Sequence, residues 1–202
     1  MFKQYVKNVF LIACSLLMLT SIQSCTQQVR FNNVDISGAT SFSPQFELQD
    51  HHGVVRHVSD FKGKVLVVFF GYTQCPDVCP TTMFEMKKVM ELLGKDADQV
   101  QVAFITLDPQ RDTLELLEKY VPSFDPRFLG LRPETDQALE QVVKGYKIFY
   151  QKVPSKDPQN YTIDHTAGSY AIDKNGQLRL FIKHNQGEQL LADDLKKLVK
   201  IN

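Results

Sequence analysis

The chain has 202 residues, with 23 Lys and Arg against 23 Asp and Glu, and 43% of the residues are hydrophobic. This length fits one domain, and the composition is that of a globular protein rather than a disordered or fibrous one. The balanced charge argues against a nucleic-acid-binding protein, which usually carries an excess of Lys and Arg. Four cysteines are too few for a small disulfide-rich fold, so their roles must be inferred from their positions in the chain.

Residues 1–24 have the pattern of a secretory signal peptide, because Lys3 and Lys7 precede an apolar run over residues 9–19. That run is shorter than the roughly 20 apolar residues that a membrane-spanning helix needs. Cys14 lies inside the run and is expected to be removed with it. Loss of Lys3 and Lys7 with the signal would leave 21 basic residues against 23 acidic ones, a slightly acidic mature chain.

The segment Leu19-Thr-Ser-Ile-Gln-Ser-Cys25 resembles a bacterial lipobox, which predicts a lipid anchor at Cys25. A cleaved signal without lipid and an uncleaved signal anchor are the alternatives. In each case the domain is expected outside the cytoplasm, on the periplasmic side of a bacterial inner membrane, where disulfides can form. Residues 25–44 are polar and without pattern, and are interpreted as a tether that reaches at most ~60–65 Å.

Residues 45–202 are interpreted as one α/β domain. The segment of residues 64–71 contains six consecutive apolar residues without alternation, which is typical of a central strand buried on both faces of a parallel sheet. The other expected elements are a β-hairpin at 46–57, strands at 100–107, 128–131 and 148–153 (the last at an edge), a hairpin of 168–172 with 178–183, and helices at 81–93, 112–120, 135–146 and 187–200. This order predicts a thioredoxin-like mixed sheet flanked by helices, with an N-terminal β-hairpin extension and an insertion between Phe124 and Ser155.

Cys75 and Cys79 follow the strongest strand and precede a helix. At the carboxyl end of such a strand, the helix N-terminus offers free N–H groups and partial positive charge, which favour a thiolate. The spacing is C-x3-C rather than the C-x-x-C of thioredoxin-type oxidoreductases. It still allows a Cys75–Cys79 disulfide or a shared metal ion, and an inert structural disulfide is the alternative.

The stretch Phe70-Gly-Tyr-Thr-Gln-Cys75-Pro-Asp-Val-Cys79-Pro80 resembles the copper-binding motif of the Sco/SenC family (synthesis of cytochrome c oxidase). Three further blocks resemble the same family in the same order, from Phe46 to Leu198. These blocks are Asp60–Lys64, Thr106–Thr113 and Asp164–Tyr170.

The resemblance implies a site for one copper ion, Cu(I) or Cu(II), at Cys75, Cys79 and His165. It implies an assembly factor, a metallochaperone rather than an enzyme with turnover, that delivers copper to the binuclear copper centre of cytochrome c oxidase or reduces the cysteines of that centre. The partners would be the oxidase subunit with that centre, and another copper chaperone or a thioredoxin-like reductant. The alternative is a thiol–disulfide oxidoreductase in which Cys75 attacks and Cys79 resolves, without an obligatory metal. Two thiolates and an imidazole suit copper and could also take zinc.

The remaining candidates have weaker signals. Asp108 and Tyr72 are expected beside the site. The carboxylate of Asp108 could tune the basicity of the thiolates or contact a partner; the alternative is that Asp108 and Pro109 only turn the chain and cap the helix that follows. Phe70 is expected to wall the site together with Tyr72. The others are expected to be solvated or structural: Asp77 in the loop, His51 and His52 in the hairpin turn, His57 at a strand end, His184 exposed, and Met83, Met86 and Met90 in the core.

Overall fold

The computed structural model describes residues 29–156 and 160–201, and an eight-stranded mixed sheet lies at its centre in the order β1-β10-β9-β4-β5-β6-β2-β3. Strands β4 (Val65–Gly71), β5 (Val100–Thr106) and β6 (Leu129–Arg132) run parallel, while β9 (Gly168–Ile172) is antiparallel to β4. Every residue of β4 is buried. The prediction of a central strand from the unbroken apolar run is therefore confirmed.

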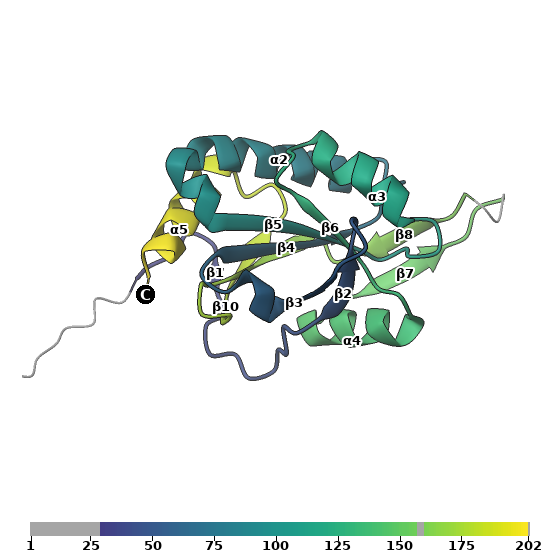
Figure 1. The fold of residues 1–202 in the computed structure, drawn as a ribbon, viewed down its shortest axis with the longest axis horizontal. Coiled ribbons are helices and arrows are strands. Elements are labelled where there is room, and N and C mark those ends of the chain that lie inside the picture. Colours follow the sequence, from purple (N-terminus) through teal and green to yellow (C-terminus); the bar gives the residue numbers. More distant parts are fainter. Residues whose placement is uncertain (1–28, 157–159, 202) are drawn as a thin grey trace, which may run out of the picture. The chain divides into compact units, whose positions relative to one another are not determined.

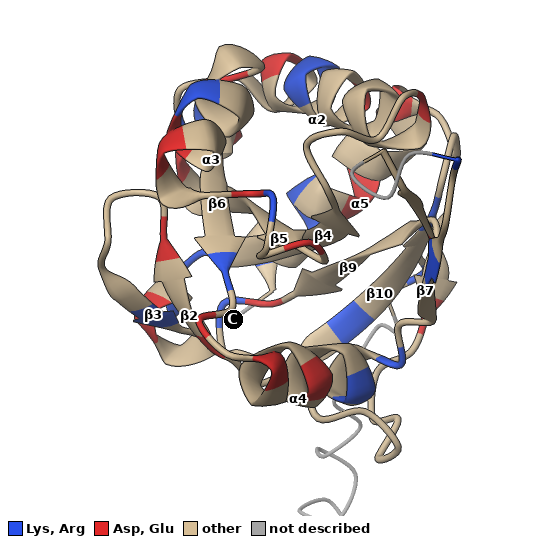
Figure 2. Cartoon of the chain, turned by 90° about the vertical axis from the view of Figure 1, so that its right-hand side faces the viewer, with Lys and Arg blue, Asp and Glu red and all other residues tan. Residues whose placement is uncertain are grey.

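Helices cover both faces of this sheet (Figures 1 and 2). Alternate residues of β4 supply two separate cores, one packed against α2 (Val78–Leu93), α3 (Leu114–Tyr120) and α5 (Glu188–Lys200), the other against α4 (Asp136–Tyr146). The fold is the expected thioredoxin-like mixed sheet. Three short 3-10 helices complete the helical elements of the described residues: η1 (Val58–Phe61), η2 (Gly94–Gln99) and η3 (Val121–Ser123).

Both predicted hairpins are present. Strands β2 (Glu47–Asp50) and β3 (Val55–His57) form the N-terminal hairpin extension, and β2 also pairs with β6. Strand β10 (Leu178–Lys183) pairs with β9 as expected.

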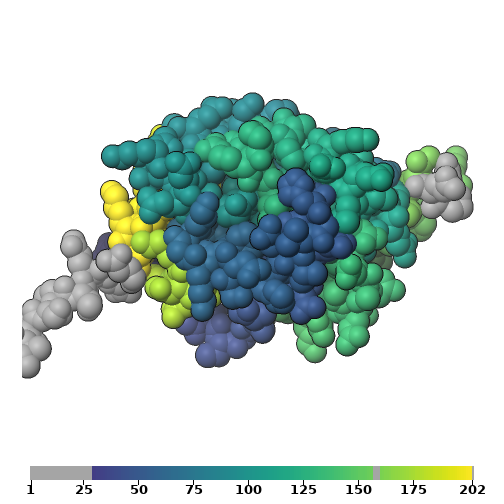
Figure 3. All heavy atoms as spheres, in the orientation of Figure 1, coloured from purple at the N-terminus to yellow at the C-terminus, as the bar shows by residue number. Residues whose placement is uncertain are grey.

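The strand expected at 148–153 does not join the edge of the central sheet. It forms β7 (Tyr150–Val153), which pairs with β8 (Thr162–His165) in a second, two-stranded sheet. The prediction of an edge strand in the central sheet was wrong, because this segment pairs with β8, a strand that was not predicted from the sequence. This hairpin projects from the body of the domain (Figure 3).

Part of the predicted tether is folded onto the domain. Strand β1 (Val34–Asp35) pairs with β10, and the buried carboxylate of Asp194 in α5 accepts hydrogen bonds of 2.8 Å from the backbone N–H groups of both Asn32 and Asn33. The compact unit begins at Phe31. A boundary at residue 45 is therefore too late, because polar residues can be buried when a partner satisfies them.

The predicted signal peptide, Cys14 and the predicted lipid anchor Cys25 lie outside the described residues. Within residues 29–156 and 160–201, none of the helices has the length and apolar character needed to cross a bilayer.

Candidate metal centre

Cys75, Cys79 and His165 come together at one end of the sheet. One ligand atom from each of them lies within 4.8 Å of the other two, and Cys79 Sγ is 3.7 Å from His165 Nε2. Cys75 lies in the loop after β4, Cys79 in the first turn of α2, and His165 at the end of β8. A pocket of about 360 Å³ opens beside Cys75 and His165, which both line it. Two sulfurs and one imidazole form a donor set that suits copper and also fits zinc.

Helix α2 begins at Val78, three residues earlier than predicted from the apolar spacing. Cys79 therefore lies inside the first helical turn, and its backbone N–H donates to Cys75 Sγ at 3.4 Å. A hydrogen bond from the Cys79 thiol is the main cause that lowers the pKa of Cys75 to about 3. The pKa of Cys79 is raised, because its thiol donates to Cys75 and because its side chain is buried. The pair is therefore unequal, with a thiolate at Cys75 and a thiol at Cys79.

The imidazole of His165 is oriented by its neighbour. Its Nδ1 lies 3.1 Å from the carbonyl oxygen of Thr166, which can only accept a hydrogen bond. The proton is therefore on Nδ1, and the lone pair of Nε2 faces the sulfur of Cys79. This is the tautomer that a metal ligand needs.

Gly71 provides the floor of the site. A Cβ atom at this position would lie 2.7 Å from Cys79 Sγ and 2.9 Å from the ring of Phe104. Cys79 is completely buried, whereas Cys75 is partly exposed. Cys75 and Cys79 are not joined by a disulfide in this structure, and the Cys75–Cys79 disulfide stays a prediction.

Of the two aromatic residues expected to wall the site, one does so. The ring of Tyr72 meets that of His165 edge-on, with centroids 6.2 Å apart, and its hydroxyl accepts the N–H of Ile163 at 3.2 Å. Phe70 instead packs in the core on the α4 face against Tyr146 and Tyr170. The prediction for Phe70 was wrong because side chains alternate along β4 and this one points to the opposite face.

The buried carboxylate of Asp108 is bonded to two groups other than the thiols. It accepts the hydroxyl of Tyr161 at 2.7 Å and pairs with Arg111. Its backbone carbonyl accepts the N–H of Arg111, so the residue turns the chain, but the cap of α3 is Thr113. Asp108 therefore turns the chain, as one alternative predicted, but it does not cap α3. Its carboxylate contacts Tyr161 and Arg111 rather than the thiols.

Two residues beside the site were not expected from the sequence. Asp112 is fully buried and accepts the backbone N–H and hydroxyl of Thr73 at 3.1 and 2.6 Å, which fixes the loop before Cys75. Burial raises the pKa of Asp112. Arg111 contacts both the cysteine loop and the hairpin that carries His165. Both lie in a block that resembles the family, but no spacing in that block indicates their partners.

The prediction of a solvated His51 was wrong. Its ring is buried, and its Nδ1 accepts the N–H of Gly130 at 3.0 Å. The ring proton is therefore on Nε2, which donates to His52 Nε2 at 3.1 Å and is not free to bind a metal. His184 is half-buried rather than exposed, with its Nδ1 3.0 Å from the Thr82 hydroxyl. Met83, Met86 and Met90 are buried in the core, as predicted.

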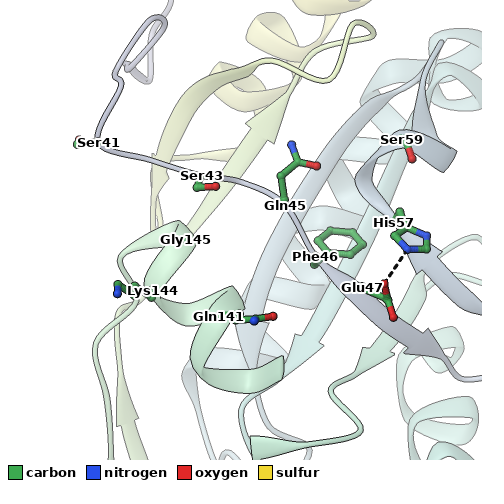
Figure 4. A pocket seen from close by; sticks show the side chains of 10 residues that line it. All are labelled: Ser41, Ser43, Gln45, Phe46, Glu47, His57, Ser59, Gln141, Lys144 and Gly145. Carbon is green, nitrogen blue, oxygen red and sulfur yellow. Dashed lines mark hydrogen bonds and ion pairs between the residues drawn. The ribbon is translucent and has the colours of Figure 1, made fainter. Parts of the chain in front are cut away.

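A second pocket, of about 670 Å³, lies between the segment of residues 41–47, strand β3 and α4 (Figure 4). Its lining includes the ion pair of His57 and Glu47, 3.1 Å apart, and the side chain of Lys144. Phe46, at its floor, belongs to the α4 core, whereas Cys79 belongs to the other. The pocket is therefore separate from the cysteines.

Comparisons with known proteins agree with this geometry. A family model described as SCO1/SenC matches residues 34–200. An SCO2-like protein of Rickettsia prowazekii is 39% identical over 140 residues, 69% of this chain and 66% of the relative. The human mitochondrial SCO2 homologue is 32% identical over 154 residues, 75% of this chain and 58% of the relative. The solved structure of Bradyrhizobium japonicum ScoI with copper bound has a TM-score of 0.72 and 39% identity, and covers 78% of this chain and 99% of ScoI. Yeast Sco1 with copper bound also has a TM-score of 0.72, with 29% identity over 80% of this chain and 90% of Sco1.

Proposed function

The chain belongs to the SCO1/SenC family, and from this membership we propose that it binds one copper ion and delivers it to the binuclear copper centre of cytochrome c oxidase. The ligands would be Cys75, Cys79 and His165. The observation that carries the proposal is the approach of two sulfurs and one correctly oriented imidazole nitrogen to within 4.8 Å of one another. Relatives whose structures contain copper share the fold at 39% and 29% identity.

The protonation states of the three proposed ligands determine how many protons must leave when copper binds. Cys75 is already a thiolate and His165 already presents a lone pair, so these two groups can bind without losing a proton. Cys79 holds a proton that must leave when the metal binds, because a thiolate is the ligand. Loading should therefore release one proton, which makes the affinity for copper fall as the pH falls.

The exposure of the ligands supports transfer rather than permanent storage. Cys75 and His165 are partly exposed at the mouth of the pocket, whereas Cys79 is buried beneath them. An incoming thiolate or imidazole of the acceptor can approach the exposed side and exchange with these two ligands. The soft thiolates favour Cu(I).

The difference between the lowered pKa of Cys75 and the raised pKa of Cys79 favours a second function, the reduction of a disulfide in the acceptor. The Cys75 thiolate would attack one sulfur of that disulfide, forming a mixed disulfide and releasing the other sulfur as a thiolate. Cys79, after losing its proton, would attack Cys75 and release the acceptor's second thiolate. The acceptor disulfide is then reduced and the Cys75–Cys79 pair oxidised, and a dithiol reductant of the thioredoxin class must restore it.

An anaerobic copper titration of the reduced full-length chain tests these functions. We expect one copper per chain, and we expect His165→Ala to lose stable Cu(II) binding, seen by electron paramagnetic resonance, while the Cys75–Cys79 disulfide can still form. His57→Ala is the matched control, because His57 is exposed and lies beside the second pocket. A copper stoichiometry near zero for the unmodified chain would refute the copper function. Full restoration of oxidase assembly in cells by His165→Ala would make disulfide reduction the physiological function.

The location follows from the sequence pattern alone. We place the protein on the periplasmic side of a bacterial inner membrane, attached through a lipid on Cys25. Metabolic labelling with a fatty-acid analogue tests this, because the label should enter the unmodified chain and be absent from Cys25→Ala. Equal labelling of both chains would contradict a lipid anchor at this residue.

A further inference from the structure

Arg111 lies between the loop that carries the cysteines and the hairpin that carries His165. Its Nη1 donates to the side chain of Gln74, next to Cys75, at 3.1 Å and to the backbone carbonyl of Tyr161 at 2.9 Å. Its guanidinium carbon is 3.6 Å from the centroid of the Tyr161 ring. Its Nε pairs with Asp108, and only 14% of its side chain is exposed. One side chain therefore links both sources of metal ligands.

The hairpin of β7 and β8 depends on such links. It forms a sheet of its own, so the ladder of the central sheet does not fix its position. An isolated two-stranded hairpin is marginally stable in water. Near the site it is attached to the domain by Tyr161, whose hydroxyl donates to Asp108 at 2.7 Å, and by Ile163, whose N–H donates to the hydroxyl of Tyr72. His165 follows two residues after Ile163 on the same strand.

We propose that Arg111, together with Asp108 and Tyr161, is a positioning residue for the metal centre. It holds the hairpin against the cysteine loop, so that His165 Nε2 stays within ligand distance of the two sulfurs. Arg111 is not one of the three proposed ligands and acts through His165. This inference rests on the proposed copper site.

The contacts require arginine rather than any cation. The planar guanidinium stacks on Tyr161 while its edge donates to Gln74, Asp108 and a carbonyl, and the ammonium of lysine cannot do both. Arg111→Lys keeps the charge but loses this geometry. Removal of groups that orient metal ligands typically weakens metal affinity by about 10- to 100-fold, which is the loss expected here.

Tyr161→Phe provides a milder variant. It keeps the ring under the guanidinium and removes only the hydroxyl bond to Asp108. We expect a smaller loss of copper affinity in the same direction, without a risk to folding. Arg127→Lys is the matched control, because Arg127 also pairs with an aspartate, Asp125, in the segment just before β6.

The test is a double-mutant cycle on the full-length reduced chain, with Cu(I) affinity measured by competition with a coloured chelator. Arg111→Lys should weaken binding in the unmodified chain but have little further effect in His165→Ala, where the two thiolates still bind Cu(I). The electron paramagnetic resonance signal of bound Cu(II) should be weaker in Arg111→Lys, in the direction of the loss expected for His165→Ala, and Arg127→Lys should leave affinity and signal unchanged.

Two results would overturn the proposal. An equal loss in both backgrounds would mean that Arg111 supports the fold and not His165, and unchanged affinity in Arg111→Lys and Tyr161→Phe would mean that neither positions a ligand. Failure of the unmodified chain to bind copper would refute the copper site itself, so the two failures are distinguishable.

Discussion

Gly71→Ala tests whether the floor of the metal centre places the sulfur of Cys79. The added Cβ would lie 2.7 Å from Cys79 Sγ, 2.9 Å from the Phe104 ring and 3.1 Å from that of Phe69. Ordinary contacts between such atoms are about 3.5–4.0 Å, so the overlap with the sulfur is close to an ångström. All three neighbours are buried, and overpacking of this kind costs about 1–3 kcal/mol of unfolding free energy.

The sulfur is the neighbour that can yield, because it moves by rotation about a single bond whereas the two rings are packed. A displaced Cys79 Sγ leaves its place 3.7 Å from His165 Nε2. We therefore expect Gly71→Ala to weaken Cu(I) binding as well as to lower the melting temperature by roughly 2–4 °C per kcal/mol for a chain of this size. Thermal unfolding of the metal-free reduced chain and chelator competition at low temperature measure the two effects separately.

Gly145→Ala is the matched control for this variant. Its Cβ would lie 2.3 Å from the backbone carbonyl oxygen of Ser43, beside the second pocket, so it should destabilise the fold without touching the metal centre. Copper affinity that stays unchanged in Gly71→Ala would refute the reasoning that this glycine seats the sulfur. Equal losses of affinity in both variants would assign the effect to general destabilisation.

Two further predictions concern protonation states. Because the thiolate of Cys75 is lost only as the pH falls through about 3, its alkylation by iodoacetamide in the metal-free reduced chain should be nearly constant between about pH 5 and 8; a rate that rises steeply around pH 8.5, the ordinary thiol range, would contradict this. His51→Phe removes the acceptor of the Gly130 N–H and should lower the unfolding free energy by about 1–3 kcal/mol in urea, while the chain still binds one copper. A lower copper stoichiometry in His51→Phe than in the unmodified chain would contradict a purely structural role of this imidazole.

The sequence predicted the elements whose signal is local. Strands β4 and β5 are unbroken apolar runs, and the loop after β4 leads directly into a helix, so the position of both cysteines follows from the chain order. Strand β8 has one buried residue, Ile163, among polar neighbours, and nothing in its sequence distinguishes it from a loop. The side of the sheet to which Phe70 points depends on the register of β4, which an unbroken apolar run does not reveal.

The contacts that fix the site and the domain boundary are long-range. Asp194 binds Asn32, 162 positions away, and Tyr161 binds Asp108, 53 positions away. From the sequence alone, each of these polar residues would be expected at the solvated surface. Their burial becomes favourable only when the fold supplies the partner, so a local pattern cannot identify them.

The three proposed copper ligands differ in how firmly the fold holds them, and this sets an order for ligand exchange. Cys79 is fixed by Gly71 and the core, and Cys75 by a helix N-terminus at the surface, whereas His165 is carried by a hairpin outside the central sheet. Displacing His165 requires that the contacts of the hairpin with Arg111, Asp108 and Tyr72 open. The two sulfurs would then still hold a bound copper ion while an acceptor ligand enters beside the partly exposed Cys75, so the ion would not need to leave coordination at any stage. A site made of three equally buried ligands would bind copper but would have to unfold locally to release it.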